Sequence, residues 1–132
     1  MQVLNYYSVV VPNKVGEAAK VLGALKEAGV NMISFWGYPI KGKQGVLDIA
    51  PADAKTFAKT IKKCGLVASP RKVAFFIDGE DQVGAVAAIL EKLAAAGINV
   101  HAAQAICAGA GRFGALVQVG AEDEKKARKV LA

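Results

Sequence analysis

The chain contains an internal repeat, and this repeat constrains the fold more than any other feature of the sequence. Residues 15–32 (VGEAAKVLGALKEAGVNM) align without a gap on residues 83–100 (VGAVAAILEKLAAAGINV), at an offset of 68 residues. Eight of the eighteen aligned positions are identical, and several others exchange one apolar residue for another. Self-similarity at a fixed offset is typical of a duplicated structural unit. We therefore expect two copies of one small fold within the 132 residues.

Each copy contains the same order of predicted elements. A β-prone run, residues 4–11 or 73–77, precedes an apolar helix that ends at a glycine. Two more strands joined by a glycine-bearing turn follow, and then a second helix with Asp53 or Asp123 as its candidate N-cap. The offset is 70 at this second helix, and we expect the two extra residues of the second copy in its hairpin turn.

This order predicts an α+β protein in which a ferredoxin-like βαββαβ unit occurs twice. We expect antiparallel sheets with the helices on one face, and two domains at residues 1–70 and 71–132. The first copy finishes with a short predicted strand at Leu66–Ser69, but the second copy lacks its last strand. The missing strand would leave an exposed sheet edge, unless the other copy or another chain covers it.

Composition narrows the possible partners. The apolar fraction of 54% is high for a short chain. It indicates that much apolar surface is buried, and it favours association into a homodimer or higher oligomer. The net charge of +6 permits an anionic partner such as a nucleic acid. However, the lysines recur at helical spacing, which is typical of solvated helix faces. A nucleic-acid partner is therefore not expected.

Cysteine usage and the N-terminal sequence predict the compartment. Cys64 and Cys107 are the two cysteines, without a CxxC pair, so we expect neither a disulfide framework nor a metal site. The start of the chain, MQVLNYYSVV, does not have the pattern of a signal peptide, and no run of about 20 apolar residues occurs. These features predict a cytoplasmic protein with no membrane segment.

The residues around the first helix of each copy resemble a known family. The stretch VVVPNKVGEAAKVLGALKEAGVNM resembles the opening of an ACT domain: a strand, a turn of the Asp-Arg-Pro-Gly kind, an apolar helix, and Ala-Gly-Val/Ile-Asn leading into the second strand. The second copy repeats it as IDGEDQVGAVAAILEKLAAAGINV. Nearly the whole chain is covered, so it most resembles the small proteins made of two tandem ACT domains. It departs from the family pattern at Asn13, where Asp is usual, and at Val15 and Val83, where Pro is common.

The resemblance implies a function as well as a fold. ACT domains are regulatory modules that bind small ligands, most often amino acids, at interfaces between paired domains. We therefore expect an allosteric regulatory protein without catalytic activity and without a cofactor. A module that only mediates assembly is an alternative.

The turns before the two first helices are the candidate ligand sites. A glycine there lets the backbone approach a ligand closely, and the free N–H groups of the helix favour a carboxylate. An asparagine or aspartate in the turn could accept from a ligand ammonium group. Alternatively, the same residues could be ordinary N-caps and packing glycines. The candidate ligand-binding residues are Asn13, Lys14, Gly16 and Asn31 in the first copy and Asp81, Gln82, Gly84 and Asn99 in the second.

Two sharper patterns compete with this interpretation. Residues 109–114 (GAGRFG) satisfy GxGxxG, the pattern of dinucleotide-binding loops, but a strand-like ALVQV follows where a helix is needed. RNA-recognition modules share the predicted element order, and Phe75, Phe76 and Phe113 could stack on bases, although Ala115 stands where a further aromatic is expected. Catalysis has less support, because His101 is the only histidine and no catalytic cluster accompanies it.

Overall fold

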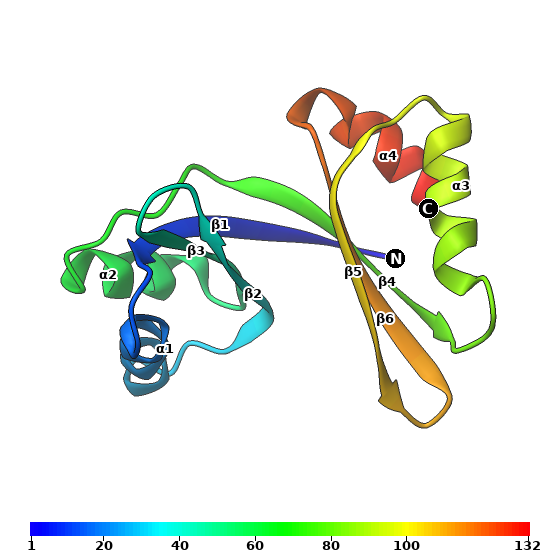
Figure 1. The fold of residues 1–132 in the computed structure, drawn as a ribbon. Helices are drawn as coiled ribbons and strands as arrows, with labels where there is room; N and C mark the ends of the chain where they lie inside the picture. Colours follow the sequence, from blue (N-terminus) through cyan, green and yellow to red (C-terminus); the bar gives the residue numbers. More distant parts are fainter. The chain divides into compact units, whose positions relative to one another are not determined.

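A computed structural model describes residues 1–132, and these residues form two compact units. The copy-one unit is Asn5–Lys72, and the copy-two unit is Val73–Ala132 together with Met1–Leu4. Each unit has an α+β fold with three antiparallel strands and two helices, drawn in Figure 1. The predicted fold class is therefore confirmed.

The elements of the copy-one unit follow the predicted order. Its strands lie side by side in the order β2-β3-β1. The residues on one face of this sheet, such as Val9 and Ile49, pack against Leu25 of α1 and Phe57 of α2. The elements are β1 (Gln2–Pro12), α1 (Glu17–Glu27), β2 (Met32–Ile40), β3 (Gln44–Pro51) and α2 (Ala54–Lys63).

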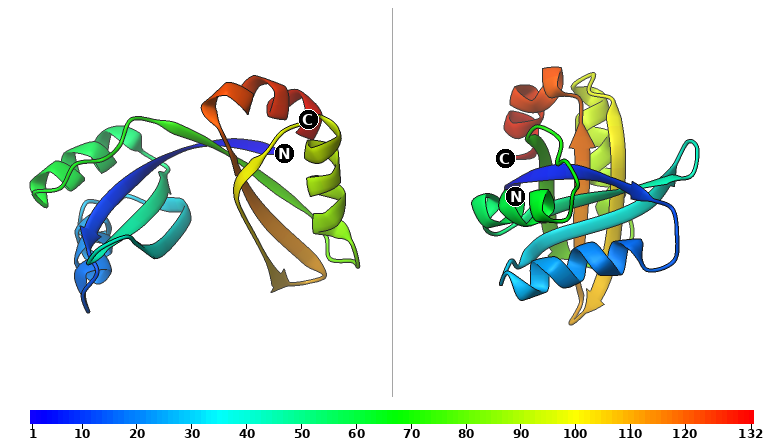
Figure 2. Two further views of the ribbon diagram at one scale, coloured as in Figure 1. Left: turned by 45° about the horizontal axis from the view of Figure 1, so that its top comes forward. Right: turned by 90° about the vertical axis from the view of Figure 1, so that its left-hand side faces the viewer.

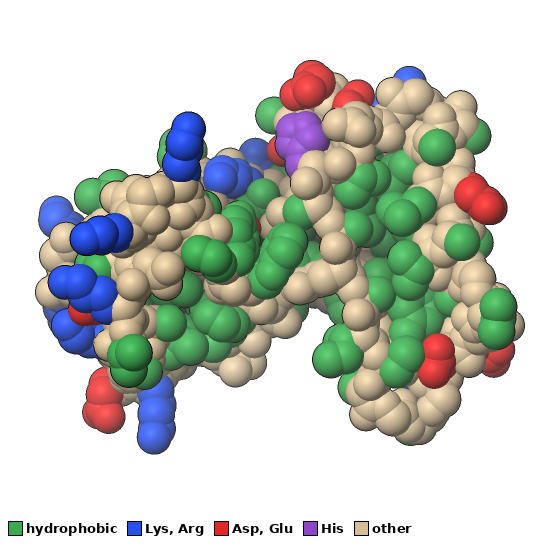
Figure 3. Space-filling view, viewed as in Figure 1, with side chains coloured by type: hydrophobic (Ala, Val, Ile, Leu, Met, Phe, Trp, Pro, Cys, Tyr) green, Lys and Arg blue, Asp and Glu red, His purple; other side chains and the backbone are tan.

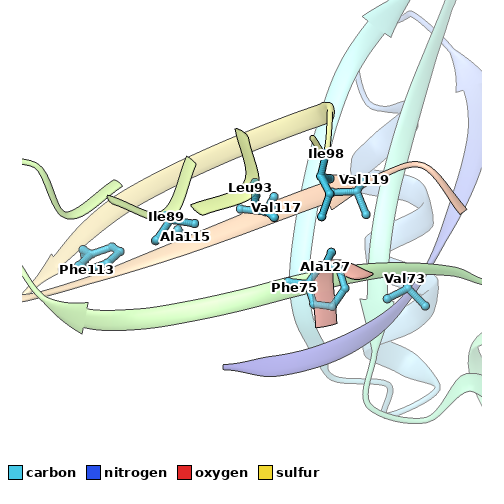
Figure 4. Packing of buried hydrophobic residues seen from close by; sticks show 10 residues of the cluster. All are labelled: Val73, Phe75, Ile89, Leu93, Ile98, Phe113, Ala115, Val117, Val119 and Ala127. Carbon is cyan, nitrogen blue, oxygen red and sulfur yellow. The ribbon is translucent and has the colours of Figure 1, made fainter. Parts of the chain in front are cut away.

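The copy-two unit repeats this arrangement with the strand order β4-β6-β5. Its two helices lie on one face of the sheet, as both views in Figure 2 show. The core between the sheet and these helices contains Phe75, Leu93, Val117 and Ala127. All four are at most 1% exposed and are labelled in Figure 4. The elements are β4 (Lys72–Glu80), α3 (Ala85–Ala95), β5 (Val100–Gly109), β6 (Arg112–Val119) and α4 (Glu124–Leu131), the last preceded by a 3₁₀ turn at Ala121–Asp123.

The ends of the two copies differ from a complete βαββαβ unit. The strand predicted at Leu66–Ser69 is reduced to one bridge between Val9 and Ala68, beside a hydrogen bond of 2.9 Å from the Ser69 amide to the Ser8 carbonyl. In the copy-two unit no strand follows α4, but the first residues of the chain belong to this unit and Val3 packs on its core. The start of β1 thus adds apolar contacts to the unit that lacks a last strand.

The two extra residues of the second copy lie after β6, so their predicted place in the hairpin turn is wrong. The strand pairs Tyr7–Ile49 and Phe75–Val117 keep the offset of 68 through both hairpins. The offset reaches 70 only at the start of the second helices, where the 3₁₀ turn precedes α4. The extra residues therefore form an added half-turn of helix.

This insertion also changes the helix caps. Asp53 caps α2 as predicted, because one carboxylate oxygen accepts from the amides of Lys55 and Thr56 at 3.1 Å. The Thr56 hydroxyl donates to the other carboxylate oxygen at 2.7 Å, and this bond, followed by the bond from the Thr56 amide, holds the pKa of Asp53 below its usual value. Asp123 makes no such bond, because the 3₁₀ turn gives it a helical backbone (φ −98°, ψ −6°) in place of an extended one. Its predicted capping role is wrong.

The lengths and compositions of the helices also bear on the membrane. No helix combines the length and the apolar character that a membrane span requires.

A buried carboxylate lies on the face of the copy-one sheet opposite its helices. Asp48 is 5% exposed, and its two oxygens accept hydrogen bonds from the Ser8 hydroxyl (2.6 Å) and the Tyr38 hydroxyl (3.0 Å). Lys72 donates to Ser8 at 2.8 Å, and the Trp36 ring packs on Tyr38 with centroids 4.9 Å apart. These contacts join β1, β2 and β3 across the sheet.

Alkaline pH should weaken the copy-one unit through Tyr38. Burial, and then the charge and hydrogen bond of Asp48, raise the pKa of Tyr38 to about 12. A tyrosine of the unfolded chain titrates near pH ~10, so the stabilisation is complete below that pH and is lost as the pH rises through ~12. We expect the free energy of unfolding to fall by ~1–2 kcal/mol across this window. Denaturant titrations at several pH values measure it. Tyr38→Phe should remove this part of the pH dependence, and an unchanged alkaline loss in the variant would contradict the assignment.

Candidate functional site

The turn before the first helix of each unit contains the same left-handed glycine. Gly16 (φ 87°) is the N-cap residue of α1, and Gly84 (φ 84°) is the N-cap residue of α3. L-residues rarely adopt this backbone conformation. A Cβ at either position would meet no heavy atom within 4 Å, so conformation rather than lack of space requires glycine here. The interpretation of Asn13 and Asp81 as N-caps is wrong.

These helices begin without a side-chain cap, in contrast to α2. No side chain accepts from the first amides of α1 or α3, because the N-cap residue is glycine in both. In α2 the carboxylate of Asp53 occupies the equivalent place. The first amide of each helix donates to a carbonyl of the turn, Glu17 to Lys14 (3.3 Å) and Ala85 to Gln82 (3.2 Å). The next N–H groups of α1 and α3 are left for water or a ligand, and the helix dipole favours an anion there.

Each turn lies against the hairpin turn of its own unit. The Asn13 amide donates to the Lys43 carbonyl at 2.9 Å, and the Asp81 amide donates to the Gly111 carbonyl at 2.8 Å. These equivalent hydrogen bonds fix the strand-to-helix turn beside the end of the β2–β3 or β5–β6 hairpin. The two predicted candidate turns therefore have the same local structure.

A hollow lies beside each turn. Hollow one, about 350 Å³, is lined by Asn13, Lys14 and Ala18 of the turn and α1, together with residues of β1, β2 and β3. Hollow two, about 400 Å³, is lined by Asp81, Gln82 and residues of α3, β5 and β6. Seven pairs of lining positions match at the offset of 68, namely 13/81, 14/82, 18/86, 37/105, 38/106, 39/107 and 45/113. The duplication has therefore produced two equivalent hollows.

The predicted site residues are only partly brought together. Gly84 lines hollow two, and Gly16 caps the helix beside hollow one without lining it. Asn31 and Asn99 line neither hollow, since they follow the opposite ends of α1 and α3. An α-helix of 11 residues is ~16 Å long, so one small ligand in either hollow does not also reach these asparagines.

Cys107 is a lining residue that sequence reasoning did not identify. A hydrogen bond to Asp81, then burial and the charge of Asp81, raise the pKa of the Cys107 thiol. The thiol therefore stays protonated and donates to the carboxylate. Only the strand register brings β5 next to the turn, so no local pattern signalled this pair. No cluster of three or more His, Cys, Asp or Glu residues that could hold a metal ion occurs.

The GAGRFG segment is a hairpin turn. β5 ends at Gly109 and β6 begins at Arg112, and these two residues pair across the turn. Gly109, Ala110 and Gly111 all have positive φ. Because a strand rather than a helix follows, the segment lacks the helix N-terminus that a dinucleotide-binding loop uses.

The aromatic residues that favoured RNA recognition lie mostly in the core. Phe75 is fully buried and Phe113 is 9% exposed, and both pack in the copy-two core beneath the helices. Figure 4 shows them among the apolar side chains of this core. RNA-recognition sheets stack bases on exposed aromatics, so these two rings do not form such a platform.

Two ferredoxin-like units in one chain, each with an uncapped helix beside a hollow, define a tandem α+β protein with paired candidate binding sites. The family model described as an ACT domain pair matches residues 1–132, and the chain belongs to this family.

Solved structures share the fold at low sequence identity. A Bacteroides thetaiotaomicron protein is 19% identical with a TM-score of 0.84, covering 98% of this chain and 86% of that one. The ligand-free regulatory subunit of aspartate kinase from Thermus thermophilus is 16% identical with a TM-score of 0.68 (98% and 89% covered). The corresponding subunit from Thermus flavus is 17% identical with a TM-score of 0.61 (98% and 93% covered). No curated protein sequence matches the chain.

Proposed function

We propose that this protein is a regulatory module that binds a free amino acid in its two hollows and performs no catalytic step. The observation that carries the proposal is the pair of equivalent hollows, each beside a helix whose first amides lack a side-chain cap. Membership of the ACT domain pair family supports a regulatory role. Two of the similar structures are described as regulatory subunits of aspartate kinase, which is in keeping with an amino-acid ligand.

The turn residues suit the two charged ends of an amino acid. The α-carboxylate would accept from the free first-turn N–H groups of α1 or α3. The α-ammonium would donate to the Asn13 side chain in hollow one or to the Asp81 carboxylate in hollow two, and Lys14 or Gln82 would face the ligand's side chain. Asn31 and Asn99 would support the start of β2 and β5 rather than contact this ligand.

Binding would become a signal by changing how chains associate. Both hollows are open to solvent, and fully exposed Val15 and Val83 lie in the turns beside them. Burying a valine side chain gains ~1.5 kcal/mol or more, so a second copy of the chain is the proposed wall that closes each hollow. A ligand that contacts this wall would stabilise one association geometry over another. The free thiols of Cys64 and Cys107 suit the cytoplasm, where we place the protein.

A thermal-shift screen of the full chain against the common amino acids tests the proposal. A ligand present at 100 times its dissociation constant adds ~2.7 kcal/mol to the free energy of unfolding. At ~4 °C per kcal/mol this is a rise of several degrees in Tm. Single-stranded RNA serves as the competing ligand. No shift with any amino acid, combined with salt-sensitive RNA retention, would contradict the proposal.

Two glycine variants locate the effect. Gly84→Val should strain the turn and place a side chain over hollow two, so we expect a smaller ligand-induced rise in Tm. Gly97→Val is the matched control, because Gly97 also has positive φ (70°) but lies at the other end of α3. Each rise is measured from the variant's own ligand-free Tm. Equal losses in both variants would place the site elsewhere.

A further inference from the structure

The two equivalent hollows differ in charge. In copy one, Lys14 lines the hollow, and Lys41 and Lys43 form the adjacent hairpin turn. The Lys43 carbonyl accepts from the Asn13 amide, which fixes the hairpin turn against the hollow. The equivalent positions of copy two, 68 residues later, are Gln82, Gly109 and Gly111. Three cations beside hollow one therefore have no counterpart beside hollow two.

Acidic residues show the opposite distribution. The end of β4 and its following turn carry Asp78, Glu80 and Asp81, and Asp81 lines hollow two. Positions 10, 12 and 13 of copy one, their equivalents, are Val, Pro and Asn. Arg112 offsets part of this charge, because its guanidinium pairs with Asp78 at 2.6 Å. The other two carboxylates, Glu80 and Asp81, form no salt bridge with a basic side chain.

The same asymmetry extends over the whole units. Residues 5–72 contain eleven Lys or Arg and four Asp or Glu, whereas the rest of the chain contains six Lys or Arg and seven Asp or Glu. On the face shown in Figure 3, Lys and Arg side chains gather over the copy-one unit, and Asp and Glu side chains predominate over the copy-two unit. The local charge beside each hollow is thus reinforced by that of its own unit.

We infer that the two hollows select ligands of opposite charge: hollow one takes an amino acid with an acidic side chain, and hollow two takes one with a basic side chain. This inference rests on the proposed function and assigns each hollow a ligand class. In both hollows the free helix amides take the α-carboxylate, so selectivity arises from the residues around the ligand's side chain. Lys14, with Lys41 and Lys43 nearby, attracts a carboxylate, whereas Asp81 and Glu80 attract an ammonium or guanidinium group.

The expected selectivity is moderate and depends on salt. A single exposed ion pair contributes little in water, but two or three like charges around one open hollow act together on the ligand. We expect about a tenfold preference in each hollow at low ionic strength, which corresponds to ~1.4 kcal/mol. Added salt shortens the Debye length to ~3 Å at 1 M and should remove most of the preference.

Calorimetric titrations of the full chain with L-glutamate, L-arginine and L-alanine test the inference. Lys14→Gln introduces into hollow one the residue of the equivalent position in copy two, and Asp81→Asn makes the converse exchange. Lys14→Gln should weaken glutamate binding about fivefold or more and leave arginine binding unchanged. Asp81→Asn should weaken arginine binding similarly and leave glutamate binding unchanged. Both side chains are exposed, and an unaltered thermal unfolding curve confirms that each variant is folded.

The possible outcomes separate this inference from the proposed function. Independent binding of glutamate and arginine, each sensitive to its own variant and to salt, would support it. Binding of alanine with the same affinity as the charged amino acids, or mutual displacement of glutamate and arginine, would overturn the charge selectivity and leave amino-acid binding standing. If none of the three amino acids binds, the charge inference is wrong, and the thermal-shift screen against all the common amino acids decides separately whether the amino-acid function stands.

Discussion

Replacement of Phe57 by alanine is expected to lower the free energy of unfolding by ~3–5 kcal/mol. Phe57 lies on α2, is fully buried, and packs against the Tyr7 ring with centroids 5.5 Å apart. Its removal forfeits apolar burial and leaves a cavity that the surrounding strands fill only in part. A domain of this kind has a total stability of ~5–15 kcal/mol, so the loss would be a large fraction.

The two copies place their largest fully buried aromatic ring on different elements, Phe57 on α2 in copy one and Phe75 on β4 in copy two. The equivalent position on α4, 70 residues later, is Ala127, which is also fully buried. In that unit Phe75, at the position equivalent to Tyr7, is fully buried and supplies the aromatic volume. Urea denaturation of Phe57→Ala and of the exposed control Val67→Ala measures the effect. A loss below ~1 kcal/mol for Phe57→Ala would contradict this packing of Phe57.

Asp48→Ala should be the most damaging polar substitution, with an expected loss of ~2–4 kcal/mol. The change removes the shared acceptor of the Ser8 and Tyr38 hydroxyls, and part-buried donors left without a partner are costly. Asp48→Asn retains one side-chain oxygen and should cost less. Leu116 occupies the equivalent position of copy two, so the network is peculiar to copy one.

A double-mutant cycle separates the network from simple loss of volume. Chemical denaturation of Asp48→Ala, Tyr38→Phe and the double variant should give a coupling energy of ~1 kcal/mol or more. The loss from Asp48→Ala should also be smaller once Tyr38 no longer carries a hydroxyl. Additive effects would mean that the hydrogen bond between these residues contributes nothing measurable.

The sequence predicted the fold well because the repeat constrains both copies together. An apolar helix ending at a glycine occurs twice at one offset, and Gly29 and Gly97 indeed have positive φ. Asp53 was identified as a cap from local pattern alone. The capping role of Asp123 was predicted wrongly, because two residues are inserted before it and change its backbone conformation. The sequences of β3 and β6 are too weakly similar to show where this insertion lies.

The candidate site was predicted in part. The turns at Asn13–Gly16 and Asp81–Gly84 lead from a strand into a helix as predicted, since the helix starts are specified locally, but the positive φ of Gly16 and Gly84 was not predicted. Asn31 and Asn99 were grouped with these turns by pattern, although a whole helix lies between them. The Asp81–Cys107 contact and the lysines beside hollow one depend on which hairpin end meets which turn, and strand register decides this.

An amide chemical-shift titration of the full chain tests the central claim most directly, namely that each copy binds an amino acid at its uncapped helix. Adding L-glutamate together with L-arginine should perturb the amides of residues 13–19 and 81–87 and leave those next to Asn31 and Asn99 little changed. The amides of α2, whose first turn Asp53 already caps, serve as the internal control. Perturbations confined to residues 28–32 and 96–100, or an unchanged spectrum at saturating concentrations, would contradict the claim.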